Sequence, residues 1–285
     1  MTDAPGGGPL RVATFNIRAA IGPGPFPDRW WRQVDPQRLA RIARVITSLD
    51  ADLVALQEVA LIATDGVVSD QAAELGRLTG YDWRYAATRS FTIDEGGPLR
   101  GAGLFGNALL SRNPIRSART VGLPMAGPDA WVEPPGAEHP AAGVRYADAP
   151  ATIREPRCAL VCEVQLPWGV GTVASTHFSH VGSGERRLQA DALALAVRDV
   201  PLPLIVLGDL NATIQSDELG PLRDRMVDAF AATGTPPGDD GRRSTDNGQP
   251  IDHVFLQGIE PTDCRVAREA GDASDHYPVV ATLAR

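Results

Sequence analysis

Polar side chains recur where the short apolar runs of this 285-residue chain end. These strand-end positions are Asn16, Glu58, Asn107, His177, Asp209, Asn211, Asp252, Asp275 and His276. Strand ends at one edge of a sheet lie close together, and acids gathered there repel one another unless a cation or a functional demand holds them. The pattern therefore predicts a sheet protein whose strand ends converge on one polar site.

The last apolar segment places an acid and a base next to each other. Asp275 and His276 directly precede a strand-like run from residue 277 to residue 283. Adjacent residues of a strand point to opposite faces of the sheet. We therefore expect the two side chains to serve different tasks, one at a metal ion and one in handling a proton.

Strand-like and helical patterns alternate through most of the chain. The first strand is predicted over residues 10–18, with Val12, Thr14 and Asn16 on one face and the odd-numbered residues on the other. Further strands are predicted over residues 52–59, 104–111, 158–166, 170–176, 202–207 and 251–256. Such alternation is typical of an α/β fold.

Three helices are predicted between these strands. Asp35-Pro36 supplies a cap and a first-turn proline for the first helix. Its apolar stripe is Leu39, Ile42, Ala43, Ile46 and Leu49. The second helix is predicted over residues 69–78, capped by Ser69 and ended at Gly80. The third covers residues 185–197, with Leu188, Ala192, Leu195 and Ala196 on its apolar side.

Residues 10–285 are predicted to form one domain, because no internal repeat or clear break divides them. Residues 1–9 are small and polar, which predicts a flexible tail and does not match a secretory signal. Residues 121–150 are rich in Pro, Gly and Ala without a clean period, and predict a long surface loop or insertion. Residues 234–248 predict a second loop.

Charge and cysteine content narrow the class of protein. The net charge is -8, whereas a chain that binds a long nucleic-acid backbone is usually basic. No run of about 18 apolar residues predicts a membrane span. Cys158, Cys162 and Cys264 cannot all pair. We expect free thiols in a cytoplasmic protein rather than a disulfide framework or a zinc site.

Oxygen donors dominate the strand-end set. They are Asn16, Glu58, Asp209, Asn211 and Asp275. Carboxylate and amide oxygens are the ligands of hard cations, whereas zinc sites favour histidine and cysteine. The sequence therefore predicts a site for Mg²⁺ or Mn²⁺.

Seven short motifs together resemble those of the endonuclease/exonuclease/phosphatase superfamily, which has the deoxyribonuclease I-like fold. They lie at residues 14–18, 56–59, 106–112, 175–178, 208–212, 251–254 and 274–278, in the order found in the family. The resemblance extends from residue 11 to residue 283. It implies a four-layer α/β sandwich, with two mixed β-sheets packed face to face and helices on the outer faces. It also implies metal-dependent hydrolysis of a phosphoester at one edge of both sheets.

The resemblance, together with the chemistry of phosphoester cleavage, implies roles for the metal and proton sites. Glu58 is expected to anchor the metal, with Asn16 close to the ion or to a phosphoryl oxygen. Asp275 is expected to bind the same ion or a second one. His276 is expected to take a proton from water, and Asp252 to accept the other ring N–H and hold the tautomer.

Further residues are expected to bind the phosphate. Asp209 and Asn211 would position the water and the phosphate, with Asp209 also available to the metal. His177 would donate to a phosphoryl oxygen, and Asn107 would bind phosphate or orient its neighbours. The sequence leaves open whether Asp209 or His276 is the general base, because coupled groups share their titration. It also leaves open whether one metal or two bind.

The substrate is the main open question. The variable loops 22–31, 91–103 and 121–150 carry aromatic residues that would either stack on a base or anchor the loops: Phe26, Trp30, Trp31, Phe91 and Trp131. Arg154 and Arg157 would bind phosphate or form ordinary salt bridges. We favour a small or nucleotide-like phosphoester. A DNA or RNA nuclease is the first alternative. An inactive binding module is the second, and the intact polar set argues against it. The oligomeric state is open.

Overall fold

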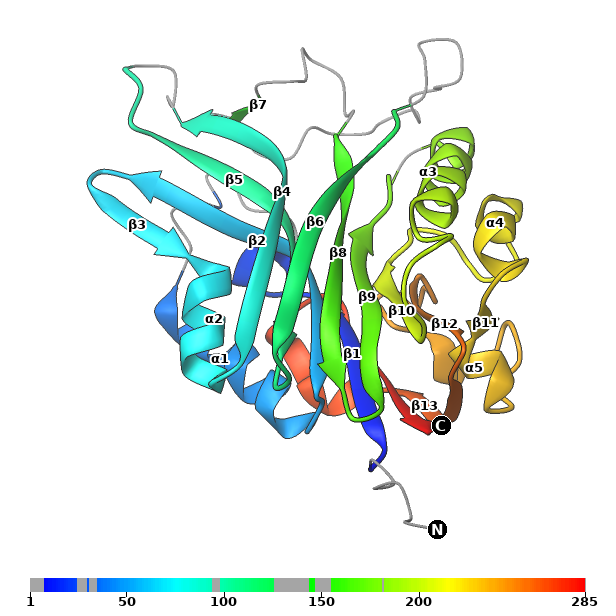
Figure 1. Ribbon diagram of the computed structural model, residues 1–285. Helices are drawn as coiled ribbons and strands as arrows, with labels where there is room; N and C mark the ends of the chain where they lie inside the picture. Colours follow the sequence, from blue (N-terminus) through cyan, green and yellow to red (C-terminus); the bar gives the residue numbers. More distant parts are fainter. Residues whose placement is uncertain are drawn as a thin grey trace.

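The computed structural model describes residues 8–24, 30, 35–93, 98–125, 144–146, 155–180 and 182–284. Most of the predicted N-terminal tail and most of the predicted insertion at 121–150 lie outside these residues. The described part forms two β-sheets packed face to face (Figure 1).

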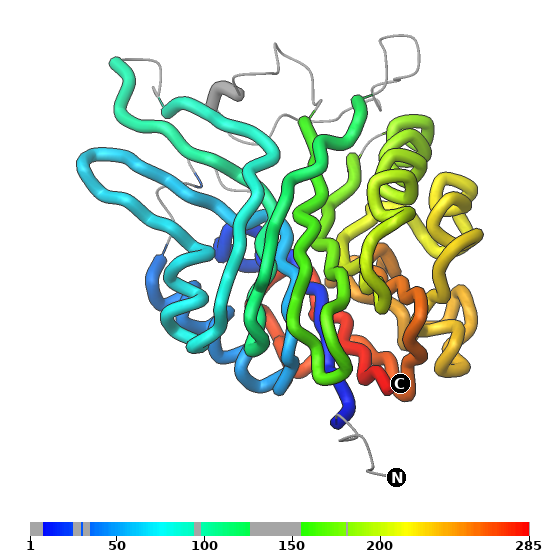
Figure 2. The backbone as a smooth tube through the Cα atoms, viewed as in Figure 1, coloured from blue at the N-terminus to red at the C-terminus, as the bar shows by residue number. Residues whose placement is uncertain are grey.

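The larger sheet has eight strands in the order β13-β14-β1-β2-β5-β4-β7, with β3 paired to β2. Its strands are β1 Leu10–Asn16, β2 Leu53–Thr64, β3 Val67–Asp70, β4 Asp82–Ile93, β5 Gly101–Ser111, β7 Val144–Tyr146, β13 Glu260–Val266 and β14 Val279–Ala284. Strands β1 and β2 are parallel and the other pairs are antiparallel. Strands β1 and β14 lie side by side (Figure 2), with Leu10 opposite Leu283.

The smaller sheet has six strands in the order β11-β12-β10-β9-β8-β6. They are β6 Ile115–Leu123, β8 Arg157–Leu166, β9 Gly169–His177, β10 Leu204–Asp209, β11 Val227–Asp228 and β12 Asp252–Gln257. Strands β9 and β10 are parallel, whereas their other neighbours are antiparallel. Both sheets are therefore mixed, as the family resemblance implied.

Helices cover the outer faces and complete the four predicted layers (Figure 1). α1 Pro36–Ser48 and α2 Gln71–Thr79 pack on the larger sheet, and α3 Ser183–Ala196 and α4 Gly220–Arg223 on the smaller one. Shorter elements are α5 Ala229–Ala232 and the 3-10 turns η1 Arg18–Ala20, η4 Asp217–Leu219, η5 Asp240–Arg242 and η6 Arg268–Ala273. Helix α1 begins as predicted, because the Asp35 side chain accepts from the backbone N–H of Gln37 at 2.8 Å. No helix of the described residues is long and apolar enough to cross a membrane.

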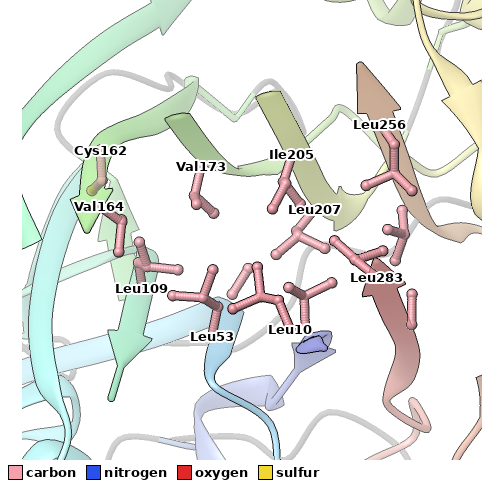
Figure 3. Packing of buried hydrophobic residues seen from close by; sticks show 14 of the residues in the cluster. Leu10, Leu53, Leu109, Cys162, Val164, Val173, Ile205, Leu207, Leu256 and Leu283 are labelled. Atoms are coloured by element: carbon pink, nitrogen blue, oxygen red, sulfur yellow. The ribbon is translucent and has the colours of Figure 1, made fainter. Parts of the chain in front are cut away.

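The core between the sheets is built by alternate strand residues. Figure 3 shows Leu53 and Leu109 of the larger sheet facing Val173 and Ile205 of the smaller one. Strand β1 divides its residues as the sequence predicted. Val12 enters this core, and the odd-numbered Ala13, Phe15 and Ile17 pack under the helices of the larger sheet.

The predicted start of the second helix was wrong. Helix α2 begins at Gln71, and its cap is Asp70, whose carboxylate accepts from Ala73 N at 3.0 Å. Ser69 instead belongs to strand β3, where it lies opposite Ile62. Because β3 pairs with the last four residues of β2, strand β2 extends to Thr64, beyond the predicted end at residue 59.

The predicted apolar side of the third helix was also wrong. Leu188 and Leu195 are 43% and 64% exposed, whereas Gln189 and Leu193 are fully buried. Gln189 lies inside because its amide oxygen accepts from the backbone N–H of Ser179 at 2.8 Å. A polar residue with a specific partner thus replaces leucine on the buried face.

Several strands were missed or displaced in the sequence reading. Strands β4, β6 and β13 were not predicted, and β6 extends to Leu123, inside the predicted insertion. Strand β7 also lies within that segment. The last strand begins at Val279 rather than at Tyr277, because the backbone N–H of Tyr277 is bonded to the carbonyl of Ser244, outside the sheet. The three cysteines are buried and free, as expected.

Candidate active site

The two sheets share a pocket of about 200 Å³ at one edge. Five of the predicted site residues line it: Glu58, His177, Asp209, Asn211 and His276. Asn16 and Asp252 lie behind these residues and contact them through hydrogen bonds. The convergence of strand ends that the sequence indicated is therefore present.

The smaller sheet places three polar residues side by side. Asp209 ends β10 and lies opposite His177, which ends β9, and opposite Asp252, which begins β12. All three are at most 5% exposed. Regular strand pairing alone accounts for this arrangement, because facing residues of neighbouring strands lie close together.

His276 meets this row of residues from the loop before β14. Its Nδ1 lies 2.8 Å from Asp252 Oδ2, and its Nε2 lies 3.7 Å from Asp209 Oδ2. Asp252 Oδ2 also accepts from the Ser244 hydroxyl at 2.6 Å. Burial lowers the pKa of His276, but the charges of Asp252 and Asp209 outweigh it and raise the pKa to about 10. The imidazole is therefore protonated at neutral pH.

The pKa of Asp209 is raised as well, here chiefly by burial. Burial disfavours its charged form, and the charge of Asp252 adds to this effect, so that its pKa rises to about 7. Asn16 and the backbone N–H of Asn211 offset part of the shift by donating to the carboxylate at 3.1 and 3.0 Å. Asp209 can therefore take up and release a proton near neutral pH.

His177 and Asn211 form a neutral pair at the same edge. The amide nitrogen of Asn211 donates to Phe178 O and to His177 Nε2, both at 3.0 Å. Because Nε2 accepts here, the ring is neutral, and burial holds the pKa of His177 well below its usual range. His177 Nε2 therefore accepts a hydrogen bond in this arrangement instead of donating one.

The larger sheet delivers Glu58 through an irregularity. The pairing of β2 with β5 shifts between Leu56 and Val59, and Glu58 adopts a left-handed backbone with φ 55°. Such strain in a residue other than glycine costs about 1–3 kcal/mol and tends to occur at functional sites. Its carboxylate accepts from Asn16 Nδ2 at 2.9 Å, and Asn16 links it in turn to Asp209.

Glu58 and Asp275 fit a divalent cation. Burial raises the pKa of Glu58, and the nearby charge of Asp275 raises it further. Asp275 is held by Arg18, with Nε 3.1 Å from Oδ2. A cation between oxygen donors would relieve this repulsion. Asp209, Asp252 and His276 also bring ligand atoms within 4.8 Å of one another, but a protonated imidazole that is bonded to Asp252 does not suit a metal ligand.

The sequence did not predict three of the pocket residues, Arg89, Phe105 and Glu155. They line the pocket beside Arg157, His180 and Trp30. Strand β4 was not predicted, so nothing in the sequence pattern placed Arg89 at the site. Arg157 was considered, and it pairs with Glu155 at 2.8 Å.

Other expected residues lie elsewhere. Asn107 does not line the pocket, and its amide donates to the carbonyl of Cys158 at 2.9 Å, which links the two sheets. Phe91 lies in β4 and packs on Trp30 with ring centroids 5.5 Å apart, so Phe91 anchors the structure, whereas Trp30 also lines the pocket. Phe26, Trp31, Trp131 and Arg154 lie outside the described residues.

Two face-to-face mixed sheets with helices on their outer faces define the deoxyribonuclease I-like fold. A profile of the Endonuclease/Exonuclease/phosphatase family matches residues 13–276. The chain therefore belongs to this family, whose members are phosphoester hydrolases that generally use divalent metals.

Individual relatives support the fold over nearly the whole chain. An endonuclease/exonuclease/phosphatase from Beutenbergia cavernae is 25% identical with a TM-score of 0.71, covering 97% of this chain and 71% of its own. A mannosyl-6-phosphatase from Bacteroides thetaiotaomicron is 18% identical with a TM-score of 0.58, covering 97% and 100%. A UPF0294 protein of Vibrio cholerae is 28% identical over 145 residues. That alignment covers 50% of each chain, so this chain spans about half the length of the curated relatives it matches.

Proposed function

We propose that this protein is a divalent-metal-dependent phosphoesterase that hydrolyses a small or nucleotide-like phosphoester with an activated water. The observation that carries the proposal is the series Asp209, His276, Asp252 and Ser244 beside the buried carboxylate of Glu58, in which hydrogen bonds join Ser244, Asp252 and His276 and an ion-pair contact of 3.7 Å joins His276 to Asp209. The series pairs a proton acceptor near neutrality with a fixed cation, and phosphoester hydrolysis needs both.

The metal would be held by Glu58 and Asp275, with Asn16 beside them. Their oxygen donors suit Mg²⁺ or Mn²⁺. When bound, such an ion supplies positive charge to the phosphoryl oxygens and to the leaving oxygen. Asp209 was also considered as a ligand from the sequence. Its pKa of about 7 and its contact with Asn16 support a role in proton transfer instead.

Asp209 is proposed as the general base. Its carboxylate takes a proton from water, the water oxygen attacks phosphorus in line, and the ester oxygen departs on the opposite side. His276, kept protonated by Asp252, donates a hydrogen bond to the phosphoryl oxygen on which negative charge develops. The sequence left the base open between Asp209 and His276, and the pKa values of about 7 for Asp209 and about 10 for His276 support this division of roles.

Asn211 is proposed to bind the phosphate by turning one amide N–H from His177 Nε2 to a phosphoryl oxygen, and the neutral ring of His177 is proposed to hold that amide in place. Asn107 is proposed to orient its neighbours, since it ties β5 to β8. Within the described residues the pocket encloses about 200 Å³, less than the 300–1,000 Å³ typical of pockets for drug-sized ligands. This size and the net charge of -8 support a compact substrate over a nucleic-acid duplex.

Residues 10–285 are proposed to act as a single catalytic domain, and the cytoplasmic location stays a prediction from the sequence. The complete polar set supports an enzyme over an inactive binding module. Glu58, Asp209, Asn211, Asp252 and His276 meet at one site, which binding alone would not require.

Turnover of simple phosphoesters tests the proposal. Purified protein is offered p-nitrophenyl phosphate, bis-p-nitrophenyl phosphate, plasmid DNA and RNA in Mg²⁺, Mn²⁺ or EDTA. We expect metal-dependent hydrolysis of a small ester and a loss of about 100-fold or more in kcat/KM for Asp209→Asn and His276→Ala. Asp199→Asn is the matched control, because that carboxylate is 79% exposed in a surface ion pair. Cleavage of nucleic acid alone would favour the nuclease alternative, and full activity of both variants would refute the site.

A further inference from the structure

Two buried arginines line the same pocket and have no part in the proposed reaction. Arg89 and Arg157 are 8% and 6% exposed. A buried guanidinium is costly unless it is paired and hydrogen-bonded, so two of them in one small pocket call for an explanation. They come from different sheets, Arg89 from β4 and Arg157 from β8.

One carboxylate holds both arginines. Glu155 Oε1 pairs with Arg89, and Glu155 Oε2 accepts from Arg157 Nη2 at 2.8 Å. Burial raises the pKa of Glu155, but the two guanidiniums outweigh it and lower the pKa to about 2. His180 Nδ1 lies 3.3 Å from Arg157 Nη2, and burial with the charge of Arg157 lowers its pKa. At neutral pH this group therefore combines two positive charges, one negative charge and a neutral ring.

The pairing of β4 is irregular directly before Arg89. The pairing of β4 with β5 shifts between Ala87 and Arg89, opposite Phe105 and Gly106 of β5. The other neighbour of β5 carries the bulge that delivers Glu58. Bulges beside active sites re-aim side chains. The Arg89 guanidinium then lies over the ring of Phe105, with 5.0 Å between Cζ and the ring centroid.

The pocket holds two polar networks. Glu58, Asn16, Asp209 and His276 form one, and Arg89, Glu155, Arg157 and His180 form the other. The first, together with Asp252, Asp275 and Asn211, already supplies the groups that the proposed hydrolysis needs. The second offers planar guanidinium donors, which match the geometry of carboxylate and phosphate. Arg157 Nε is buried with no hydrogen-bond partner among the described residues.

We propose that Arg89 and Arg157 form a second anion subsite, which recognises a phosphate or carboxylate of the substrate other than the ester that is hydrolysed. This inference rests on the proposed phosphoesterase function. Since one pocket of about 200 Å³ holds both networks, the two anionic groups belong to one compact molecule. The substrate class is a small phosphoester with a second negative group, a phosphorylated acid or a bisphosphate.

Binding of phosphonates, which are not hydrolysed, tests the subsite without turnover. Calorimetry in Mg²⁺ compares propylphosphonate with 3-phosphonopropionate and with 1,2-ethylenediphosphonate, probes of similar length that add a carboxylate or a second phosphonate. We expect at least one doubly anionic probe to bind the wild type about 10-fold more tightly than propylphosphonate, which corresponds to about one charge-assisted contact. The better of the two probes identifies the second group as carboxylate or phosphate.

Substitutions of the two arginines test whether they cause the tighter binding of the doubly anionic probes. In Arg89→Gln and Arg157→Gln the affinity ratio should fall below about 2, and Arg157→Lys, which keeps the charge without the planar fork, should retain only part of it. Arg77→Gln, a change at a side chain that is 68% exposed, is the matched control and should keep the full ratio. Thermal melts verify folding, and Arg157→Lys decides the outcome if a glutamine variant does not fold.

Three results would overturn the subsite. They are equal affinity of the wild type for all probes, an unchanged ratio in the arginine variants, and an equal loss for all probes, which would place the arginines on the phosphonate that the probes share. None of these results bears on whether p-nitrophenyl phosphate is hydrolysed, so failure of the subsite and failure of the proposed function remain distinguishable.

Discussion

The two sheets deliver polar residues to the pocket in different ways. The smaller sheet places His177, Asp209 and Asp252 with regular backbone, because they face one another on paired strands, and only Asn211 beyond the end of β10 has a left-handed φ of 50° among its site residues. The larger sheet departs from regular pairing at two of its contributions, although Asn16 comes from the regular end of β1. Glu58 has φ 55° at a bulge, and Arg89 follows a second bulge.

The two sheets therefore pay different free-energy costs for placing their site residues. On the smaller sheet the cost is electrostatic, because Asp209 and Asp252 are buried side by side and His276 must stay charged between them. On the larger sheet the cost is conformational, because Glu58 must occupy a left-handed backbone. The electrostatic cost of the smaller sheet should change with pH, and the conformational cost of the larger sheet should change when glycine replaces the strained residue.

The largest expected effect is the pH dependence of stability in EDTA. The pKa of His276 is raised from 6.5 to about 10, so its contribution is complete below pH 6.5 and is lost as the pH rises through 10. Asp209 acts in the same direction between pH 3.8 and 7, because its pKa is also raised. Stability should therefore fall with rising pH, by at most about 1.4 kcal/mol per pH unit for each titrating proton.

Urea unfolding across pH measures this dependence. His276→Gln should flatten the limb between pH 6.5 and 10 relative to the wild type. Glu155 tests the other network, since its pKa is lowered from 4.5 to about 2. Its contribution is present above pH 4.5 and lost as the pH falls through 2, so Glu155→Gln should flatten the acid limb only. An alkaline limb that survives in His276→Gln would contradict the charge assignment.

The same contrast explains what could be predicted from the sequence. Asp209, Asp252 and His177 end or begin apolar runs, and regular pairing brings them together, so pattern alone located them. The fold followed from the same alternation and from the family motifs. Arg89 lies in the middle of a strand that the pattern did not reveal, and its aim depends on a bulge that has no signature in the sequence.

Local propensity also failed where a tertiary contact took precedence. Ser69 is a good cap, yet pairing of β3 with β2 placed it in a strand and left Asp70 to cap α2. Leu188 and Leu195 read as core residues, yet the bond from Ser179 N to Gln189 turned the helix so that both are exposed. These outcomes depend on partners distant in the chain, which one periodic pattern cannot supply.

The second prediction concerns Gly106, which faces both bulges. A Cβ at this position would lie 2.0 Å from the carbonyl oxygen of Ala86. Gly106→Ala should therefore lower the free energy of unfolding by about 3 kcal/mol, at the upper end of overpacking costs. It should also weaken metal binding, because the bulge that carries Glu58 must move. Urea unfolding and metal calorimetry measure the two effects.

Gly122→Ala is the matched control for this change. Gly122 also lies in a strand, but a Cβ there meets nothing within 4 Å among the described residues. Its stability should change by less than about 0.5 kcal/mol, as for other surface substitutions. Equal effects of the two substitutions would mean that the close approach at Gly106 does not constrain the bulges.

The smallest expected effect isolates the strain at Glu58. Glu58→Gly removes the left-handed penalty and the repulsion from Asp275, and loses the hydrogen bond from Asn16. The free energy of unfolding should rise by about 1 kcal/mol, since relief of about 1–2 kcal/mol is partly offset by the flexibility of glycine in the unfolded chain. Metal binding, followed by calorimetry, should be lost.

Asp65→Gly separates backbone from charge in this result. Asp65 has φ 50° in a turn, and its exposed ion pair with Arg100 contributes little. In Asp65→Gly the free energy of unfolding should rise only through relief of the backbone strain. This rise should be smaller than that for Glu58→Gly, and metal binding should be unchanged. If Glu58→Gly instead destabilised the protein, the carboxylate would be holding the edge of the two sheets together. The larger sheet would then gain stability from its irregular residue, and the contrast with the smaller sheet would fail.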